Sequence, residues 1–241
     1  MATGPAVSIV LTQMRFPSAS VALFGPLTLQ VAPGEVVALI GPSGVGKTSL
    51  LRMVGGEERR FEGQVLVGGV SADQAPPSGF VFQDARLLPW LDAADNIRAV
   101  QPDIGLVEID ALLSKVGLAG MRSAYPRQLS GGMQRRLGLA RAIAAGSGLL
   151  LLDEPFVSLD KAVVLELLTL FRSIFRAEDP TVILVSHDPE DAAQLADRVV
   201  ILAGRPARIV ADFRLPEAST REPEAIARTV DAIVTAQKEA Q

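Results

Sequence analysis

Residues 41–49 read GPSGVGKTS, and this stretch decides the fold. It has the pattern G-x-x-x-x-G-K-[ST], which ends at Thr48. The apolar run EVVALI comes directly before it, and the helical pattern KTSLLRMV begins at Lys47. A phosphate-binding loop requires this context of a buried strand before the turn and a helix after it. We therefore expect a nucleotide site here; the alternative is a glycine-rich turn with a chance lysine.

Backbone geometry explains the glycines of this loop. Gly44 and Gly46 lack a Cβ, so the chain can wind tightly and point successive N–H groups at a phosphate. The helix that begins near Lys47 adds the positive end of its dipole. Lys47 brings a mobile charge to the β- and γ-phosphates, and Thr48 offers a hydroxyl to Mg²⁺. The predicted nucleotide-binding residues of the loop are Gly41, Pro42, Ser43, Gly44, Val45, Gly46, Lys47, Thr48 and Ser49.

A pair of carboxylates follows the most apolar run of the chain, LLLLDE at 149–154. Four leucines place this strand in the core, so Asp153 and Glu154 emerge at its C-terminal edge, where open α/β sheets bind ligands. We assign Asp153 to Mg²⁺, and Glu154 to the water that attacks the γ-phosphate. The alternative is a solvated turn, because Pro155 ends the strand.

Composition bounds the class of protein. The chain has 241 residues, which fits one large domain or one domain with a subdomain, and its 49% hydrophobic content suffices for a sizeable core. A net charge of −4 argues against non-specific nucleic-acid binding. The absence of cysteine excludes disulfides and thiolate metal sites. We expect no membrane span and no secretory signal. A soluble cytoplasmic protein and a soluble subunit docked on a membrane partner both fit.

Short apolar runs alternate with helical patterns, which predicts an α/β fold with a mostly parallel sheet. A β-rich N-terminal part is followed by buried strands and longer helices. The segment 84–146 is mostly helical and is expected to be inserted between two core strands. The expected strands are 7–11, 27–31, 64–67, 35–40, 79–83, 149–153, 181–186 and 198–202, and the expected helices are 47–54, 106–116, 131–145, 159–176 and 222–241.

A second candidate anion site lies at LSGGMQRR, residues 129–136. Ser130 is a good helix N-cap, and the two glycines after it let another group approach the first free N–H groups of the helix. A capped helix without further function would look the same. A chain that already holds a phosphate loop needs a reason for a second such site.

In this order and spacing, GPSGVGKTS, LSGG and LLLLDEP resemble the ATP-binding subunit of an ABC transporter. The resemblance covers almost the whole chain. It implies one ABC ATPase domain with a RecA-like, phosphate-loop core at about 1–83 and 147–215, and an antiparallel N-terminal β-subdomain. It also implies a helical subdomain at about 84–146 and a C-terminal helical tail at about 216–241.

The resemblance also implies an assembly. In the family, two such subunits pair head-to-tail, and the LSGG signature of one closes over the γ-phosphate held by the phosphate loop of the other. This implies a homodimer or a paired ATPase subunit that binds ATP and Mg²⁺. The residues that would reach the partner's nucleotide are Ser130, Gly131, Gly132, Gln134 and Asp160. The chain departs from the family's usual sequence at Gln134-Arg135-Arg136 and at Val157-Ser158. These departures affect the expected contacts between the two subunits and leave the expected ATP binding unchanged.

Two further positions come from the resemblance. Gln83, in VFQD, matches the glutamine that senses Mg²⁺ and water and links to the membrane subunit, so it is assigned to both metal and catalysis. Phe16 lies where an aromatic ring would stack on adenine. Phe24 in that place, or a core role for Phe16, is the alternative.

The only histidine of the chain lies in ILVSHDPED. Asp188 fits an N-cap and Pro189 a first helical position, so His187 stands between a strand and a helix. It matches the family histidine that contacts the γ-phosphate, whereas a lone histidine is commonly structural. Neutral imidazole can accept from one partner and donate to another. We assign His187 a catalytic role beside Glu154, Gln83 and Lys47.

Four stretches resemble the nitrate, sulfonate and taurine importer branch: LLPW at 87–90, DNI at 95–97, YPRQLSGG at 125–132 and DRVVILAGRPARI at 197–209. The implied partners are transmembrane permease subunits and, indirectly, a solute-binding protein, with no nucleic acid. The chain would then sit at the cytoplasmic face of the inner membrane.

Other functions remain open at this point. An exporter or a lipid transporter is the closer alternative to an importer. A non-transport ABC ATPase acting on nucleic acid, or another phosphate-loop enzyme such as a kinase, is more distant. The apolar patch of Leu87, Leu88 and Trp90 is predicted to receive a helix of the permease; a small core under a loop is the other reading.

Overall fold

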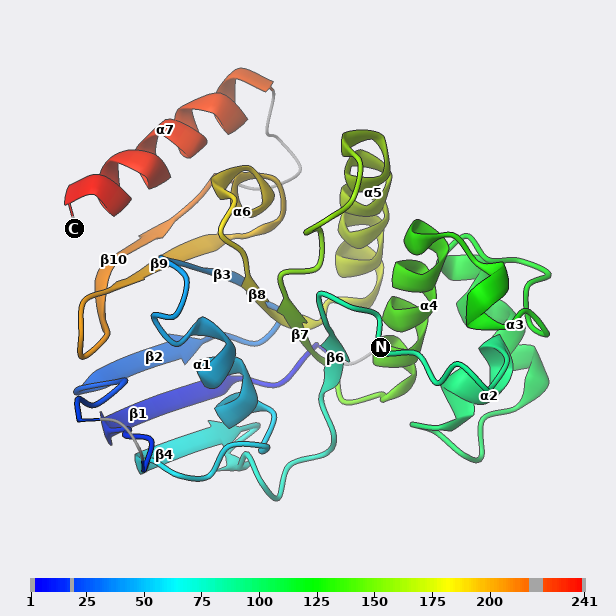
Figure 1. Ribbon diagram of the computed structural model, residues 1–241, viewed down its shortest axis with the longest axis horizontal. Coiled ribbons are helices and arrows are strands. Elements are labelled where there is room, and N and C mark those ends of the chain that lie inside the picture. The colour runs from blue at the N-terminus through cyan, green and yellow to red at the C-terminus, as the bar shows by residue number, and fades with distance from the viewer. Residues whose placement is uncertain (1–2, 18–19, 217–222, 240–241) are drawn as a thin grey trace.

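The computed structural model describes residues 3–17, 20–216 and 223–239. These residues form two sheets, with the strand orders β2-β1-β4-β5 and β10-β9-β3-β8-β7-β6. Figure 1 shows the smaller sheet below the larger one, with a group of helices to one side. The architecture is the mixed α/β arrangement predicted from the sequence.

The smaller sheet is antiparallel and comes from the N-terminal part of the chain. Its inward side chains alternate along the strands, and Ile9 faces both Leu29 and Val65 in the register. All three are nearly or fully buried and pack in the same core cluster as α1. Its strands are β1 (Val7–Gln13), β2 (Leu27–Val31), β4 (Glu62–Val67) and β5 (Val70–Ser71).

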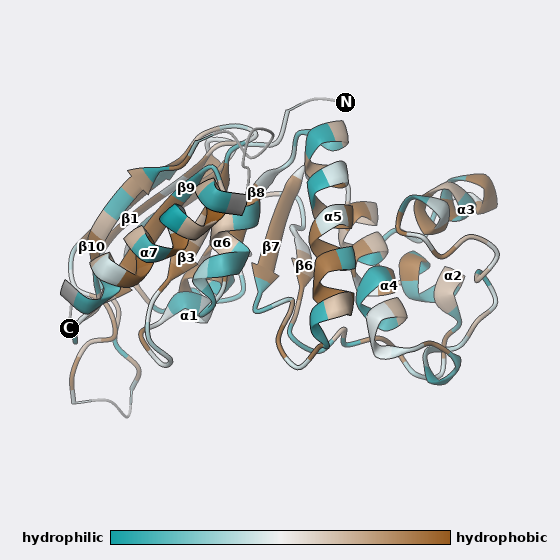
Figure 2. Cartoon of the chain, turned by 90° about the horizontal axis from the view of Figure 1, so that it is seen from above, coloured by the Kyte–Doolittle hydropathy of each residue, from teal (hydrophilic) through white to brown (hydrophobic). Residues whose placement is uncertain are grey.

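The larger sheet carries the candidate site at the C-terminal ends of its parallel strands. β3 and β8 are buried at every position, which explains their continuous apolar runs. Figure 2 shows the apolar colour along the central strands. The parallel strands are β6 (Gly79–Val81), β7 (Leu149–Asp153), β8 (Thr181–Val185), β3 (Val36–Ile40) and β9 (Arg198–Ala203).

An antiparallel edge strand, β10 (Arg208–Arg214), was not predicted. Most of its positions are half-buried or exposed, and the strand carries Arg208, Asp212 and Arg214. Arg198 on β9 holds Asp212 through two hydrogen bonds of 2.6 Å. Without the apolar run of a central strand, an edge strand of this kind gives only a weak sequence signal.

Four helices flank the larger sheet. α5 starts later than predicted, because Asp160 occupies its N-cap, and it ends at Asp179, whose φ of 49° is left-handed. α7 packs against α6 and β9, as Figure 1 shows. The predicted helix 222–241 extends beyond the described residues at 222 and at 240–241. The bounds are α1 (Lys47–Val54), α5 (Lys161–Glu178), α6 (Pro189–Leu195) and α7 (Pro223–Glu239).

Three α-helices and one short 3-10 helix (Pro126–Gln128) lie between β6 and β7 in the sequence, and the α-helices form the group at the side of Figure 1: α2 (Ala93–Arg98), α3 (Leu106–Lys115) and α4 (Gly131–Ala144). Ile97, Ile109, Leu113 and Leu137 are fully buried. The six-residue α2 was not predicted, because it is too short to show a helical period. The division into a core and a helical subdomain stays a prediction.

Among the helices of the described part of the chain, none combines the length and the apolar character that a membrane span needs.

Candidate nucleotide site

The phosphate loop joins β3 to α1 and is shaped by its glycines. Gly46 is the N-cap of α1 and has a φ of 113°, in the left-handed region that glycine favours. A Cβ on Gly46 would collide with the ring of Phe24, which is fully buried below it. The tight turn therefore depends on both the backbone angle of Gly46 and the close approach of Phe24.

Lys47 is held inside the loop. Its side-chain Nζ donates to the carbonyl oxygens of Gly41, at 2.7 Å, and Pro42, at 3.2 Å, and the residue is only 6% exposed. Burial lowers the pKa of Lys47, while the nearby carboxylates of Glu154 and Asp153 act in the opposite direction. The result is a pre-placed cation at the floor of the loop.

Thr48 meets Asp153 across the end of β7. The Thr48 hydroxyl donates to Oδ1 of Asp153 at 2.9 Å. Burial raises the pKa of Asp153, and the hydrogen bond from Thr48 opposes that shift. One hydroxyl and one carboxylate, all oxygen donors, suit Mg²⁺, which uses one or two carboxylates and completes its shell with water and phosphate oxygens.

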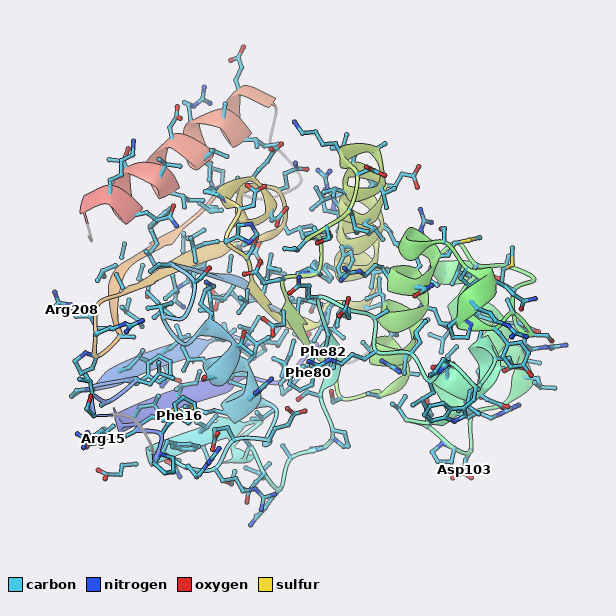
Figure 3. All side chains as sticks on the ribbon, in the orientation of Figure 1. Arg15, Phe16, Phe80, Phe82, Asp103 and Arg208 are labelled. Atoms are coloured by element: carbon cyan, nitrogen blue, oxygen red, sulfur yellow. The ribbon has the colours of Figure 1, made fainter. Side chains whose placement is uncertain are left out.

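A cavity of about 350 Å³ gathers most of these side chains. Gln83, from the segment after β6, borders it together with Asp153 and Glu154. Phe16 also lies on its wall and is half-buried, whereas the alternative Phe24 is completely buried and has no face free for a ring to stack on. Figure 3 labels Phe16. The lining is Phe16, Leu23, Ser43, Gly44, Gly46, Lys47, Thr48, Ser49, Gln83, Asp153 and Glu154.

His187 reaches across the site to Glu154. Nδ1 of His187 shares a hydrogen bond with Oε2 of Glu154. Glu154 has a φ of 52°, a left-handed conformation, and its backbone N–H donates to Val185 of β8 at 2.9 Å. The two strand ends β7 and β8 thus present their polar side chains to each other, and the imidazole side chain keeps 57% of its surface exposed.

A residue that sequence reasoning missed supports this turn. Asp191, on α6, accepts a hydrogen bond of 2.6 Å from the hydroxyl of Ser186, and that hydroxyl accepts one of 3.0 Å from the N–H of Asp188. Ser186 and Asp191 are both buried. Burial raises the pKa of Asp191 to about 6. The only signal in the sequence was a polar Ser186 at the end of an apolar strand.

Asp191→Asn is expected to change how stability depends on pH. The carboxyl of Asp191 binds its proton more tightly in the folded chain than in the unfolded one, so its contribution to the free energy of unfolding falls as pH rises through about 6. The amide does not titrate. The free energy of unfolding of the variant, relative to that of the wild type, should therefore be about 1 kcal/mol higher at pH 7.5 than at pH 5. Urea titrations at both pH values measure this. Asp231→Asn on the exposed side of α7 is the control; an unchanged difference at the two pH values would contradict the expectation.

The residues predicted to reach a partner's nucleotide lie elsewhere. Ser130 caps α4 by accepting from the N–H of Met133 at 3.3 Å, and Asp160 is the N-cap of α5. Gln134 uses its amide nitrogen within its own segment, on the carbonyl oxygens of Pro126 and Leu129 at 3.0 and 3.1 Å. None of these borders the phosphate-loop cavity. The predicted site residues therefore form two separate groups on one chain.

Comparison with known proteins identifies the family. A family model described as ABC transporter matches residues 24–157. The chain belongs to the ABC transporter family. It is an ATP-binding subunit, and its hydrolysis of ATP is coupled to transport. The matched residues include the glycine loop, the carboxylate pair and the LSGG helix described above. The family expected from the sequence is confirmed.

Relatives and a solved structure agree with this. The protein is 41% identical over 203 residues to aliphatic sulfonates import ATP-binding protein SsuB 2 of Burkholderia lata, covering 83% of this chain and 74% of that one. It is 40% identical over 191 residues to SsuB of Bacillus subtilis, covering 76% and 73%. The ATP-binding cassette MJ0796, solved as a dimer in a post-hydrolysis state with ADP and Pi, shares the fold with a TM-score of 0.73 at 24% identity, over 88% of this chain and 99% of that one. This ABC ATPase fold is the one predicted.

Proposed function

We propose that this ABC ATPase powers the import of alkanesulfonates or related small organic anions. The observation that carries the chemistry is the meeting of the phosphate loop, Asp153 and Glu154 in one cavity, with His187 on Glu154. The import direction and the solute class are supported by relatives named as aliphatic sulfonate import proteins. The stretches LLPW and DRVVILAGRPARI point to the same branch.

The chain's own residues divide the work of hydrolysis. Lys47 and the backbone of the loop from Gly41 to Ser49 would bind the β- and γ-phosphates, and Phe16 would stack on adenine. Glu154 would take a proton from the attacking water. His187, bonded to Glu154, would orient that carboxylate and contact the γ-phosphate. Each group acts from the end of a strand or the start of a helix, so little reorganisation precedes reaction.

Thr48 and Asp153 would hold Mg²⁺, with Gln83 on the wall of the same cavity. A Mg²⁺ ion held by Thr48 and Asp153 would supply positive charge that offsets the negative charge of the phosphates during hydrolysis. Asp153 also contributes in the absence of the metal, since it orders the Thr48 hydroxyl at the start of α1. Gln83 is exposed and free to approach both the metal and the attacking water.

A second subunit would complete the site. Ser130, Gly131 and Gly132 open the N-terminus of α4, which offers unpaired N–H groups and a positive dipole end to an anion. Because these residues, Gln134 and Asp160 lie outside the chain's own cavity, they would reach the nucleotide of a partner subunit. The dimeric MJ0796 neighbour is consistent with this arrangement.

The permease would dock on the turn that carries Trp90. Trp90 is 70% exposed, whereas Leu87 is partly buried against the helical core. Asn96, fully buried, fixes the turn by accepting from the Leu88 N–H at 2.8 Å and donating to the carbonyl oxygens of Leu88 and Leu91 at 3.1 and 3.0 Å. Leu87 of this patch therefore belongs to the core, whereas Trp90 is exposed on a fixed turn, where a partner can contact its ring. The subunit would sit at the cytoplasmic face of the membrane.

Trp90→Ala is expected to weaken assembly with the membrane subunits and to lower sulfonate uptake at least about tenfold, because an exposed aromatic anchor at an interface carries much of its binding energy. Co-purification with a co-expressed permease, and uptake of a labelled alkanesulfonate by proteoliposomes with the solute-binding protein, measure both effects. Val107→Ala, which removes an 83% exposed apolar residue on α3, is the control. Normal assembly of Trp90→Ala would rule out the docking turn. Absence of sulfonate-dependent ATP hydrolysis in the wild-type complex would overturn the proposed solute.

A further inference from the structure

Arg135, on α4, links two loops that lie far apart in the sequence. Its Nη1 donates to the carbonyl oxygen of Phe82 at 2.9 Å, and its Nη2 donates to that of Val157 at 3.1 Å. Only 9% of the residue is exposed. Phe82 comes directly before Gln83, and Val157 directly before Ser158. One guanidinium therefore joins the backbone beside the predicted metal-sensing glutamine to the backbone beside the segment 158–160, whose Asp160 is predicted to reach the partner's nucleotide.

The first loop is held by α4 at more than one point. Arg141, two turns further along, donates to the carbonyl oxygens of Ala85 and Arg86 at 2.8 and 2.9 Å. Phe82 stacks on Phe80 with the ring centroids 5.1 Å apart, and Arg86 lies 3.9 Å over the Phe82 ring. Figure 3 shows the two phenylalanines together at β6. The backbone on both sides of Gln83 is thus fixed to one face of α4, while the Gln83 side chain stays exposed.

The second loop, residues 157–160, is short and has a strained backbone. Ser158 has a φ of 64°, an unfavourable conformation for a residue with a Cβ, which persists only when the surroundings hold it. The Val157 N–H donates to the backbone carbonyl oxygen of Glu154 at 3.4 Å, so this loop continues directly from the residues of the carboxylate pair. Arg135 supplies the contact to Val157 from outside the loop. Burial lowers the pKa of Arg135, yet a guanidinium keeps its charge in proteins, so both donors stay available.

We propose that Arg135 is a positioning residue that makes the Gln83 loop and the loop 157–160 move as one unit. This rests on the proposed function, in which the first loop faces Mg²⁺ and the permease and the second faces the partner subunit. A planar fork with two donors at a fixed separation passes displacement from one carbonyl to the other, which a single ammonium on a flexible stem does less well. A permease that shifts the Gln83 loop would thereby also shift Asp160.

The test compares Arg135→Gln and Arg135→Lys with the wild type, all as full chains, and uses ATP as the probe. We expect Arg135→Gln to lower kcat about tenfold, since small displacements remote from the chemistry cost at least this much. The KM for ATP and the Kd of a fluorescent ATP analogue should change less than about twofold, because Arg135 does not border the phosphate cavity. Arg135→Lys, with one charged donor left, should recover part of kcat. Arg122→Gln, which removes a surface arginine paired with Asp110, is the matched control.

A double-mutant cycle with Gln83→Ala separates positioning from general destabilisation. If Arg135 acts through the Gln83 loop, Arg135→Gln added to Gln83→Ala lowers kcat by much less than it does alone. Additive losses, or a wild-type kcat in Arg135→Gln, would overturn the proposal, and the ATPase of the wild type would still support the proposed function. If Arg135→Gln fails to fold, a wild-type kcat in Arg135→Lys overturns it instead. No ATP hydrolysis by the wild type, even with its permease, would overturn the proposed function itself.

Discussion

Glu154→Gln is expected to lower the kcat of ATP hydrolysis by about 10²- to 10⁴-fold and to leave ATP binding intact. The amide has the shape of the carboxylate and can still bond to His187, but it cannot accept the proton of the attacking water. The Nζ of Lys47 donates to the carbonyl oxygens of Gly41 and Pro42, so the loop that binds the phosphates keeps these hydrogen bonds in the variant. Closed dimers should accumulate with ATP, because the step that reopens them is lost.

Phosphate release and nucleotide binding measure the two halves of this prediction, and light scattering with and without ATP measures the dimer. Glu62→Gln, on an exposed position of β4, is the control for the change of charge. Turnover at the wild-type rate would remove Glu154 from the role of base. If the chains stay monomeric with ATP and permease present, the proposal that two subunits share the nucleotide site is wrong.

Lys47→Ala is expected to raise the Kd for ATP by about 10- to 100-fold, the loss that follows from deleting a charged hydrogen-bond donor to phosphate. The variant also leaves the carbonyl oxygens of Gly41 and Pro42 without the donor that holds them. Calorimetry with ATP measures the change. Lys238→Ala near the end of α7 is the control. ATP affinity equal to the wild type would show that the loop binds phosphate through its N–H groups alone.

The sequence predicted those parts of the site that short contiguous segments build. The phosphate loop, the end of β7 and the N-cap of α4 each lie within about ten residues, and each depends on local rules for glycine, apolar runs and capping. The buried strands β3, β7 and β8 were visible for the same reason. In the helical segment, the position of α3 followed from its apolar period, and that of α4 from the Ser130 cap before it and Gly146 after it.

Contacts between distant segments could not be predicted in this way. The sequence alone does not distinguish Phe16 from Phe24. Tertiary packing places Phe16 on the cavity wall and Phe24 against Gly46. Asp191 and Arg135 act through backbone or hydroxyl groups of other elements, and no local pattern assigns these contacts to either side chain, although Arg135 lies within the LSGGMQRR stretch. The edge strand β10 escaped because its register with β9, rather than its own composition, makes it a strand.

The ring of Phe24 packs directly against Gly46, in the space that a Cβ at position 46 would need. The same aromatic side chain is completely enclosed in the cluster that joins the N-terminal sheet to the phosphate loop. A larger or smaller residue at position 24 would therefore reshape the anion cradle directly, with no intervening layer to absorb the misfit. Because Gly46 also has a φ of 113°, a smaller residue at position 24 would make space for a Cβ but would not remove the backbone strain of a substitution at position 46.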